Sequence, residues 1–324
     1  MKPSRTIPSC GSLLGGLLLG AVLLSSCSGV EERHPVQGVP LTFSSVATKG
    51  FVPDDELYDY YADDWRDILV SAYLHAQEGE DGDYFVASTF AHDDATSSWH
   101  CTPEEVYWPL GATMDFLALS TGVPLSAADI TWGVPSAASR VRVAVPRTYL
   151  DDDILYGCAA GCASTDGPVA MTFRHAQAYI DVTVRLAPNT TGDVRVSSVR
   201  LTDVYPEGDL TVVNDAGVAE ASWSFRRFRA EDLELMPSSE PMSIPNTVGE
   251  ILLPEQEQTS LVIDYTLDGA AHSRTIELPH ERWIMGRAYS YDVRIKGTFQ
   301  AVQGSIAPGI EVSLRERPLR AVRR

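Results

Sequence analysis

The stretch Ala288-Tyr289-Ser290-Tyr291-Asp292-Val293-Arg294-Ile295-Lys296 alternates apolar and polar residues without interruption. Successive side chains of a β-strand point to opposite faces, so one face of this segment is apolar and the other is polar. The alternation therefore predicts a half-buried strand, in a sheet that has one face against a core.

Two further segments repeat the pattern nearer the N-terminus. Residues 261–267 alternate up to Asp268-Gly269, a pair typical of tight hairpin turns, and residues 274–278 supply the returning strand. Residues 176–186 form another alternating run. In a regular strand, Met171 and Phe173 would point to the face opposite that of the apolar residues in 176–186. We therefore expect a bend or bulge near Arg174 and His175, which would keep the apolar residues on both sides of it buried.

Shorter strands are predicted in the first half of the chain, separated by proline and glycine. They cover residues 41–46, 68–75, 84–90, 114–119 and 141–145. Since no run longer than about ten residues keeps a helical period, the sequence predicts an all-β fold of antiparallel sandwiches. A cluster of small and turn-forming residues at 162–168 marks the predicted seam between a domain at 51–165, to which strand 39–46 is added, and a domain at 166–324.

The N-terminus has the features of a secretion signal. Lys2 and Arg5 precede the apolar run 13–24, which is shorter than the roughly 20 residues that span a bilayer. The following Leu24-Ser25-Ser26-Cys27 resembles a bacterial lipobox. That resemblance implies removal of residues 1–26 and acylation of Cys27, which would anchor segment 27–50 and the body behind it to a membrane. An ordinary secretion signal is the alternative.

Charge excludes one class of partner. Removal of the signal takes two of the 25 basic residues and none of the 44 acidic ones, which leaves a net charge of −21. Nucleic acid binding needs a basic face that releases counterions, so nucleic acid is not an expected partner.

Three cysteines would remain beside the lipidated one, and they are Cys101, Cys158 and Cys162. The spacing of Cys158 and Cys162, with Gly161 between them, allows either a small looped disulfide or two free buried thiols. A zinc site is not predicted, because the C-x3-C pair has no second half.

Candidate catalytic and metal-binding residues have simpler structural interpretations. His92 and His100 lie in polar sequence without a recognisable catalytic signature, and His175 is predicted to be a structural residue at the bend. The acidic stretches 54–64 and 78–83 lack the full spacing of a calcium loop, which favours solvated loops. Aromatic residues of the first stretch could instead stack on sugars; these are Tyr58, Tyr60, Tyr61 and Trp65.

Several short motifs together resemble the fimbrillin-like proteins, lipoprotein subunits of type V pili in Gram-negative anaerobes. In chain order they are Tyr107-Trp108-Pro109, Met114-Asp115-Phe116, Asp153-Ile154-Leu155-Tyr156, Phe173-Arg174-His175-Ala176, and Trp283 with Gly286-Arg287-Ala288-Tyr289-Ser290-Tyr291. The resemblance implies two transthyretin-like β-sandwich domains, no catalytic site, no cofactor and no metal. It also implies a location at the outer membrane surface, other pilus subunits as partners, and adhesion to a host or bacterial surface ligand.

The same resemblance implies proteolytic processing after the first strand. Cleavage after Lys49 would remove strand 39–46, on which Val39, Leu41 and Phe43 share one face, and would open an edge for a strand from another subunit. Cleavage after Arg33 would release the lipid and leave the strand in place. Some relatives are not cut, so an unprocessed protein with Lys49 in a loop is the alternative.

The C-terminus departs from the family pattern. Residues 314–324 are basic and contain Pro318, which is unsuitable for a central strand, so 306–314 is the last predicted strand. This departure makes an accessory or basal subunit an alternative to a stalk subunit. From a different class, a surface lipoprotein that binds glycans through exposed aromatics is the competing hypothesis.

Overall fold

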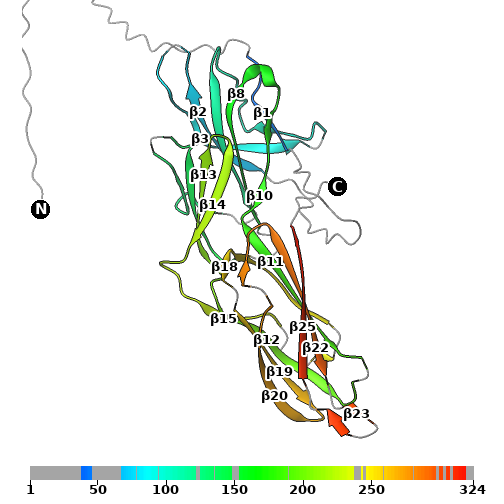
Figure 1. Cartoon of the computed structure of the whole chain (residues 1–324). Helices are drawn as coiled ribbons and strands as arrows, with labels where there is room; N and C mark the ends of the chain where they lie inside the picture. The colour runs from blue at the N-terminus through cyan, green and yellow to red at the C-terminus, as the bar shows by residue number, and fades with distance from the viewer. Residues whose placement is uncertain are drawn as a thin grey trace, which may run out of the picture. The chain divides into compact units, whose positions relative to one another are not determined.

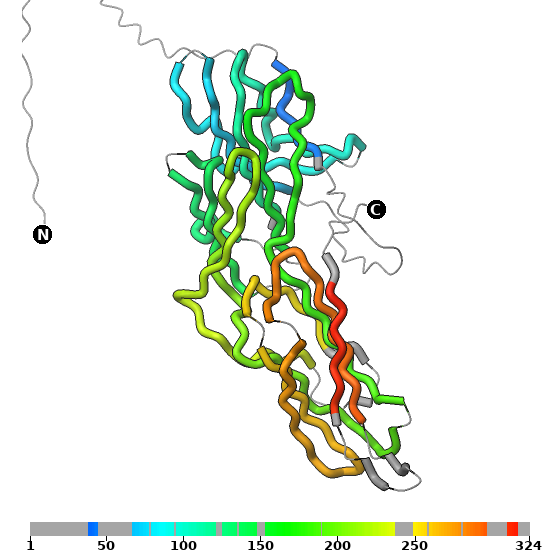
Figure 2. Tube along the Cα trace, in the orientation of Figure 1, coloured from blue at the N-terminus to red at the C-terminus, as the bar shows by residue number. Residues whose placement is uncertain are grey.

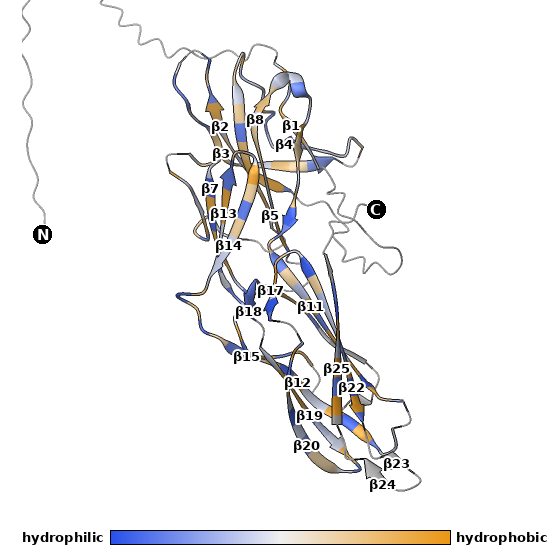
Figure 3. Ribbon diagram, in the orientation of Figure 1, coloured by the Kyte–Doolittle hydropathy of each residue, from blue (hydrophilic) through white to orange (hydrophobic). Residues whose placement is uncertain are grey.

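A computed structural model describes residues 38–45, 67–77, 79–93, 95–121, 125–134, 136–147, 153–188, 190–236, 242–243, 246–257, 259–279, 281–296, 299–301, 304–306 and 309–318. These residues form strands and one short 3-10 helix, η2 (Ser164–Asp166). The predicted all-β fold is confirmed. Figure 3 shows hydrophobic and hydrophilic residues interleaved along the strands, which is the pattern that the sequence predicts for half-buried sheets.

An eight-stranded sheet and a four-stranded sheet build the N-terminal sandwich (Figure 1). The larger sheet has the order β10-β8-β5-β2-β3-β4-β1-β9 and the smaller one β14-β13-β7-β6. The larger sheet contains β1 (Thr42–Ser45), β2 (Ile68–His75), β3 (Gly82–Asp93), β4 (Ser98–Cys101), β5 (Thr113–Thr121), β8 (Ile154–Ala163), β9 (Val169–Met171) and β10 (Arg174–His175). The smaller one contains β6 (Ile130–Trp132), β7 (Arg140–Val145), β13 (Gly208–Asp215) and β14 (Val218–Ser224).

Strand β5 contributes side chains to two separate apolar cores, one on each face of the larger sheet. Met114, Phe116 and Ala118 enter one buried cluster, which they share with residues of β1, β2, β3, β4 and β9. Leu117 and Leu119 point the other way, into a second cluster shared with β7, β8 and β13. Because both faces of β5 are buried, its central residues are apolar on both phases, which is why alternation is weak there.

The C-terminal sandwich packs the sheet β17-β11-β22-β25 against the sheet β15-β12-β19-β20, with one large apolar core between them. The first sheet contains β11 (Gln177–Leu186), β17 (Asn246–Pro254), β22 (Arg287–Lys296) and β25 (Gly309–Pro318). The second contains β12 (Val194–Val204), β15 (Glu231–Glu234), β19 (Ser260–Leu267) and β20 (Ala270–Glu277), and β16 (Met242–Ser243) pairs with β12. Two small ribbons complete the fold, β18 (Gln256–Glu257) with β21 (Arg282–Trp283) and β23 (Phe299–Ala301) with β24 (Gly304–Ile306).

The predicted hairpin at residues 261–278 is confirmed as β19 and β20. Asp268 and Gly269 connect the two strands with φ values of 49° and 81°. Two consecutive positive φ values define the tight turn that matches the twist of an antiparallel pair, and glycine adopts the second at no steric cost.

The predicted bend near His175 is where the chain passes from one sandwich to the other. Ala176 belongs to the core shared by β5, β7 and β8, whereas Ala178 belongs to the core of the C-terminal sandwich. The amide of Ala176 donates to the carbonyl of Ile154 at 2.8 Å, and the carbonyl of Ala176 accepts the indole N–H of Trp223 at 2.8 Å. The change of phase in the sequence thus reflects a change of core.

Strand pairing differs from the seam expected at residues 162–168. β8 and β9 flank that stretch, yet both belong to the eight-stranded sheet. The hairpin β13–β14 also returns to the N-terminal sandwich, where β13 pairs with β7 (Figure 1). The existence of two separable domains stays a prediction, but their border would fall near Ala176, and residues 208–224 would belong to the first domain.

The last strand is longer than the sequence indicates. β25 continues through the charged residues to Pro318 and pairs with β22 along its whole length. It lies at the end of its sheet, where a strand can carry charged residues and a terminal proline removes no necessary hydrogen bond. The expected end at Leu314 is therefore wrong, because an edge strand tolerates a sequence that a central strand would not.

Candidate functional site

The N-terminal strand β1 lies between two strands that come later in the chain (Figure 2). Phe43 faces Trp99 of antiparallel β4 on one side and Val169 of parallel β9 on the other. Just before β1, the amide of Leu41 donates to the carbonyl of Val106 at 2.7 Å, and Val39 accepts from the amide of Trp108 at 3.0 Å. Backbone hydrogen bonds thus hold the segment along its length.

Two side chains of this segment are fully buried. Leu41 and Phe43 are 1% and 0% exposed, and the Phe43 ring meets the rings of Phe90 and Phe116 edge to face, at centroid distances of 4.8 and 5.1 Å. Val39 was expected on the same buried face, but it is 52% exposed. Val39 precedes the strand, so the alternation of buried and exposed side chains does not extend to it.

Several predicted site residues lie outside the described residues. They are the lipidation candidate Cys27, the processing candidates Arg33 and Lys49, and the acidic and aromatic stretch 54–65. Their roles stay predictions. Within the described part of the chain, β9 pairs with no strand other than β1, so departure of β1 would leave β9 without a partner and would expose one edge of β4.

Cys101 lies beside the N-terminal segment. Thr42 is opposite His100, the residue before Cys101, and Cys101 packs against the apolar cluster that contains Leu41 and Phe43. The thiol is half-buried, and burial raises its pKa above the ordinary value. A thiol covered in this way reacts slowly, so its reactivity would report whether the segment is in place.

Cys158 and Cys162 are free thiols, both on β8. Free thiols are one of the two alternatives that the spacing allowed, and the looped disulfide stays a prediction. Burial raises the pKa of Cys158 to about 11, which makes it a poor nucleophile.

The structure brings His100 together with Ser98, a pair that the sequence did not indicate. His100 Nε2 lies 2.9 Å from Ser98 Oγ. Thr96 Oγ1 lies 2.7 Å from Ser98 Oγ and donates to Asp93 at 2.9 Å. Hydroxyl groups thus lie between the carboxylate and the imidazole, unlike a catalytic triad, in which the acid orients the imidazole directly. These contacts fit a hairpin held by polar side chains.

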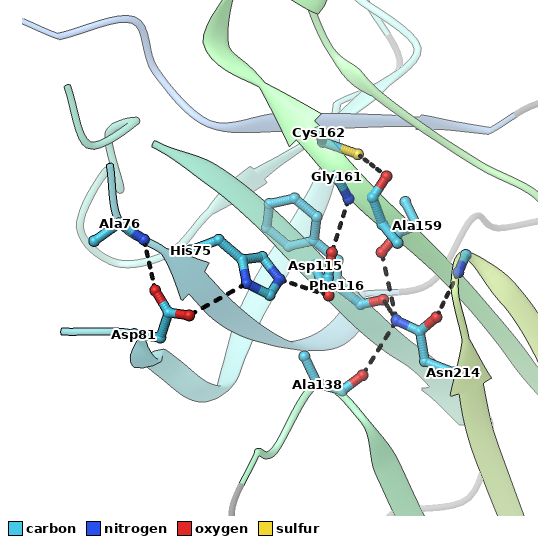
Figure 4. A network of polar contacts seen from close by, with 12 residues as sticks. His75, Ala76, Asp81, Asp115, Phe116, Ala138, Ala159, Gly161, Cys162 and Asn214 are labelled. Atoms are coloured by element: carbon cyan, nitrogen blue, oxygen red, sulfur yellow. Dashed lines mark hydrogen bonds and ion pairs between the residues drawn. The ribbon is translucent and has the colours of Figure 1, made fainter. Parts of the chain in front are cut away.

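Asp115 is the centre of a second polar network that local sequence could not reveal (Figure 4). Its carboxylate lies 2.8 Å from His75 Nε2 and accepts the amide of Gly161 at 2.7 Å, at a residue with φ of 63°. The hydrogen bond that His75 donates to the Asp115 carboxylate raises the pKa of His75 above 6.5. Asp115 thereby secures an irregular turn of β8 against β5, where the register shifts.

Asn214 performs a similar structural role from the opposing sheet. Its side-chain amide donates to the carbonyls of Phe116, Ala138 and Ala159 at 3.1, 3.2 and 3.4 Å (Figure 4). His175, predicted to be structural, bonds through Nδ1 to the partly buried carboxylate of Asp153. These networks join segments that are far apart in sequence, so only the folded chain brings their members together.

In the described part of the acidic stretch 78–83, two carboxylates accept hydrogen bonds from backbone amides. Asp81 accepts from Ala76 at 2.9 Å, and Asp83 accepts from Ala137 at 2.8 Å. A search of the described residues found no cluster of three His, Cys, Asp or Glu side chains able to hold a metal ion. The same part of the chain contains no helix with the length and apolarity needed to cross a membrane.

Comparisons with known proteins agree with the fold. A structure of a fimbrial protein from Bacteroides vulgatus has a TM-score of 0.58 at 14% identity, over 86% of this chain and 99% of that one. A cell-adhesion candidate from Bacteroides uniformis has a TM-score of 0.54 at 14% identity, over 88% and 99% of the two chains. Another from Parabacteroides distasonis has a TM-score of 0.51 at 12% identity, over 88% and 98%.

At such identities, the structures are evidence for the fold alone. No curated protein matched the sequence. The family model described as fimbrillin-like matches residues 58–309, well over half of the chain, and includes every motif on which the resemblance was based. This chain belongs to the fimbrillin-like family.

Proposed function

We propose that this chain is a surface-anchored subunit or accessory protein of a type V pilus, which assembles by strand exchange at the position of β1 and mediates adhesion. Membership of the fimbrillin-like family supports a fimbrial and adhesive role at the cell surface. The observation that supports strand exchange is β1 itself, a short strand seated between two edges and followed closely by a basic residue.

The energetic basis is the burial of Leu41 and Phe43. Two fully buried apolar side chains stabilise the seated strand by about 3–6 kcal/mol relative to solvent exposure. Removal of β1 would expose their apolar contacts together with the unpaired edges of β4 and β9. A strand of similar pattern from another subunit would restore both the burial and the backbone hydrogen bonds.

Processing and anchoring complete the proposal. Cleavage after Lys49 would detach β1 from the body, whereas cleavage after Arg33 would separate the lipid from a body that keeps β1. Acylation of Cys27 would hold the uncut precursor at the outer membrane. Other pilus subunits would be the partners of the cut form, and a host or bacterial surface ligand would be the adhesion target.

Mild trypsin treatment of the purified precursor tests strand exchange. We expect cleavage after Lys49, faster reaction of Cys101 with a thiol reagent, and then oligomers that resist SDS without heating. The Lys49→Ala variant should keep Cys101 protected and stay monomeric, while Arg33→Ala should behave like the wild type. A clean cut at Lys49 that leaves a stable monomer at high concentration would contradict strand exchange.

That outcome would favour the competing hypothesis of a glycan-binding lipoprotein. A monomer that binds glycans should show selective retention on immobilised sugars, and the retention should fall when Tyr58, Tyr60, Tyr61 and Trp65 are replaced together by alanine. A monomer without such retention would contradict both hypotheses.

A further inference from the structure

The ring of Phe43 lies at the centre of an aromatic cage, which consists of Phe85, Phe90, Trp108 and Phe116. Phe90 and Phe116 contact the Phe43 ring edge to face, with interplanar angles of 86° and 87°. Behind them, Phe85 contacts Phe90 at a centroid distance of 5.8 Å, and Trp108 contacts Phe116 at 5.9 Å. Perpendicular rings place the positive edge of one against the negative face of the other, an attraction that an aliphatic side chain lacks. The cage therefore fits an aromatic ring better than a leucine side chain.

The two inner rings of the cage are held independently of β1. Phe90 lies on β3 and Phe116 on β5, and both strands pair with β2. In the order of the larger sheet, β4 separates both of them from β1. Departure of β1 would therefore take away the central ring and leave Phe90 and Phe116 on strands that keep their pairing. A site that is preformed in this way binds its occupant with a smaller loss of conformational freedom.

Backbone pairing determines where a replacing strand must place its ring. β1 runs antiparallel to β4 and parallel to β9, and Phe43 is opposite Trp99 and Val169. Leu41, two residues earlier, is buried in the same apolar cluster. A strand that enters in the direction of β1 must therefore carry an aliphatic residue, one intervening residue and then an aromatic residue.

We propose that the site of β1 selects its replacement by this aliphatic-x-aromatic pattern, with Phe90 and Phe116 as the residues that determine the specificity. The partner is an extended segment of another subunit that carries the pattern. The selectivity rests on the strand exchange proposed above and narrows its partner, since burial alone would accept any apolar strand. Two edge-to-face contacts correspond to a preference of about tenfold or more for phenylalanine over leucine.

Peptide competition on the cut chain tests this selectivity. The precursor is cleaved with trypsin, and an excess of a fluorescent peptide of residues 39–46 displaces the cut N-terminal fragment. The peptide contains neither Lys nor Arg, so residual trypsin leaves it intact. We expect the unlabelled peptide to compete about tenfold better than its Phe43→Leu form, and better than a peptide of reversed sequence and identical composition. The uncut precursor, whose own strand occupies the site, should not bind the fluorescent peptide.

Variants of the body test whether the cage causes the preference. Phe116→Leu removes one of the two edge-to-face contacts and should lower the preference to about threefold. The matched control is Leu117→Ala on the same strand, whose side chain lies in the other core. This control destabilises the sandwich but should keep the tenfold preference. Since the preference is a ratio of two affinities on one protein, a general loss of stability does not change it.

The outcomes separate this selectivity from strand exchange itself. Equal competition by the native peptide and its Phe43→Leu form would overturn the selectivity and leave strand exchange intact. A preference that Phe116→Leu leaves unchanged would overturn the role of the cage, and equal competition by the reversed peptide would overturn the pattern. Equal binding to the uncut precursor would overturn the assignment to the site of β1. If cleavage after Lys49 is confirmed by mass spectrometry and the cut chain binds no peptide, both strand exchange and the selectivity are wrong.

Discussion

Strands β1 and β22 differ in how firmly each is held. β22 is paired through eight residues with β11 and through ten with β25, and Tyr289, Tyr291, Val293 and Ile295 are buried in one core. β1 is paired through two residues with β4 and three with β9. We therefore expect release of β22 to require unfolding of its sandwich, whereas release of β1 would break fewer pairs and leave only β9 without a partner.

Replacement of Trp283 should have the largest effect. The side chain is fully buried in the C-terminal core, and its indole donates to the Tyr291 hydroxyl at 2.9 Å. Trp283→Ala should destabilise the fold by about 3–5 kcal/mol in urea unfolding followed by circular dichroism. The milder Tyr291→Phe, which leaves the indole unpaired, should cost about 1–3 kcal/mol. A cost below that of Tyr291→Phe for the tryptophan variant would contradict this account of the core.

Replacement of Phe43 should act more locally. Phe43→Ala removes a buried ring, a change that lowers the free energy of unfolding by up to about 3–5 kcal/mol. The global loss should be smaller than this, because β1 alone can detach while the rest of the fold stays intact. We expect faster Cys101 labelling without unfolding of the C-terminal sandwich. Val39→Ala is the control, since an exposed side chain should change stability by about 0.5 kcal/mol or less. Simultaneous unfolding of both sandwiches would show that β1 is not an independent element.

Asp209 provides an intermediate case on β13. Burial raises the pKa of its carboxyl, but hydrogen bonds from Arg227 and Arg142 outweigh burial and hold the pKa below 3.8. Asp209→Asn should cost about 1.5–3 kcal/mol at neutral pH, because it replaces charged hydrogen bonds. A group with a lowered pKa stabilises above its unfolded pKa, so the difference from wild type should shrink as pH falls below about 4. A difference that is constant down to pH 2 would contradict the assignment.

The smallest effect is expected at His75. Its pKa is raised by the hydrogen bond and charge of Asp115, so an NMR titration should give a value above 6.5. Asp115→Asn should return the pKa toward 6.5, while its amide oxygen can still accept from Gly161. A raised pKa stabilises the fold below 6.5, and the contribution is lost as pH rises through the folded pKa. An unchanged pKa in the variant would show that Asp115 is not the cause.

Local patterns were sufficient for some strands, but they missed β12, β13, β14 and β17 and did not determine how the strands assemble. β2 occupies the predicted residues 68–75, and β22 begins one residue before the predicted segment. β13 was not among the predicted strands, and no local signal relates it to its neighbour β7, more than sixty residues earlier. The parallel pairing of β1 with β9 has no local signal for the same reason.

The candidate site was predicted in part. Leu41 and Phe43 are buried, as their spacing indicated, because both lie where the sheet is continuous. Val39 lies beyond the last regular pairing, so alternation no longer determines its exposure. The partners of Asp115 and Asn214 come from separate strands, and no spacing rule relates them.

The position of β1 also determines when the N-terminal sandwich can be completed during synthesis and export. Val169, which faces Phe43, is synthesised about 125 residues later, and β13 of the opposing sheet follows later still. Closure over such separations is slow compared with local hairpin formation. β4 is made well before β9, so a growing chain passes through a stage in which β1 can pair with β4 while its other edge is still open. Any factor that prevents premature pairing would have to shield this edge of β1 in the newly made chain.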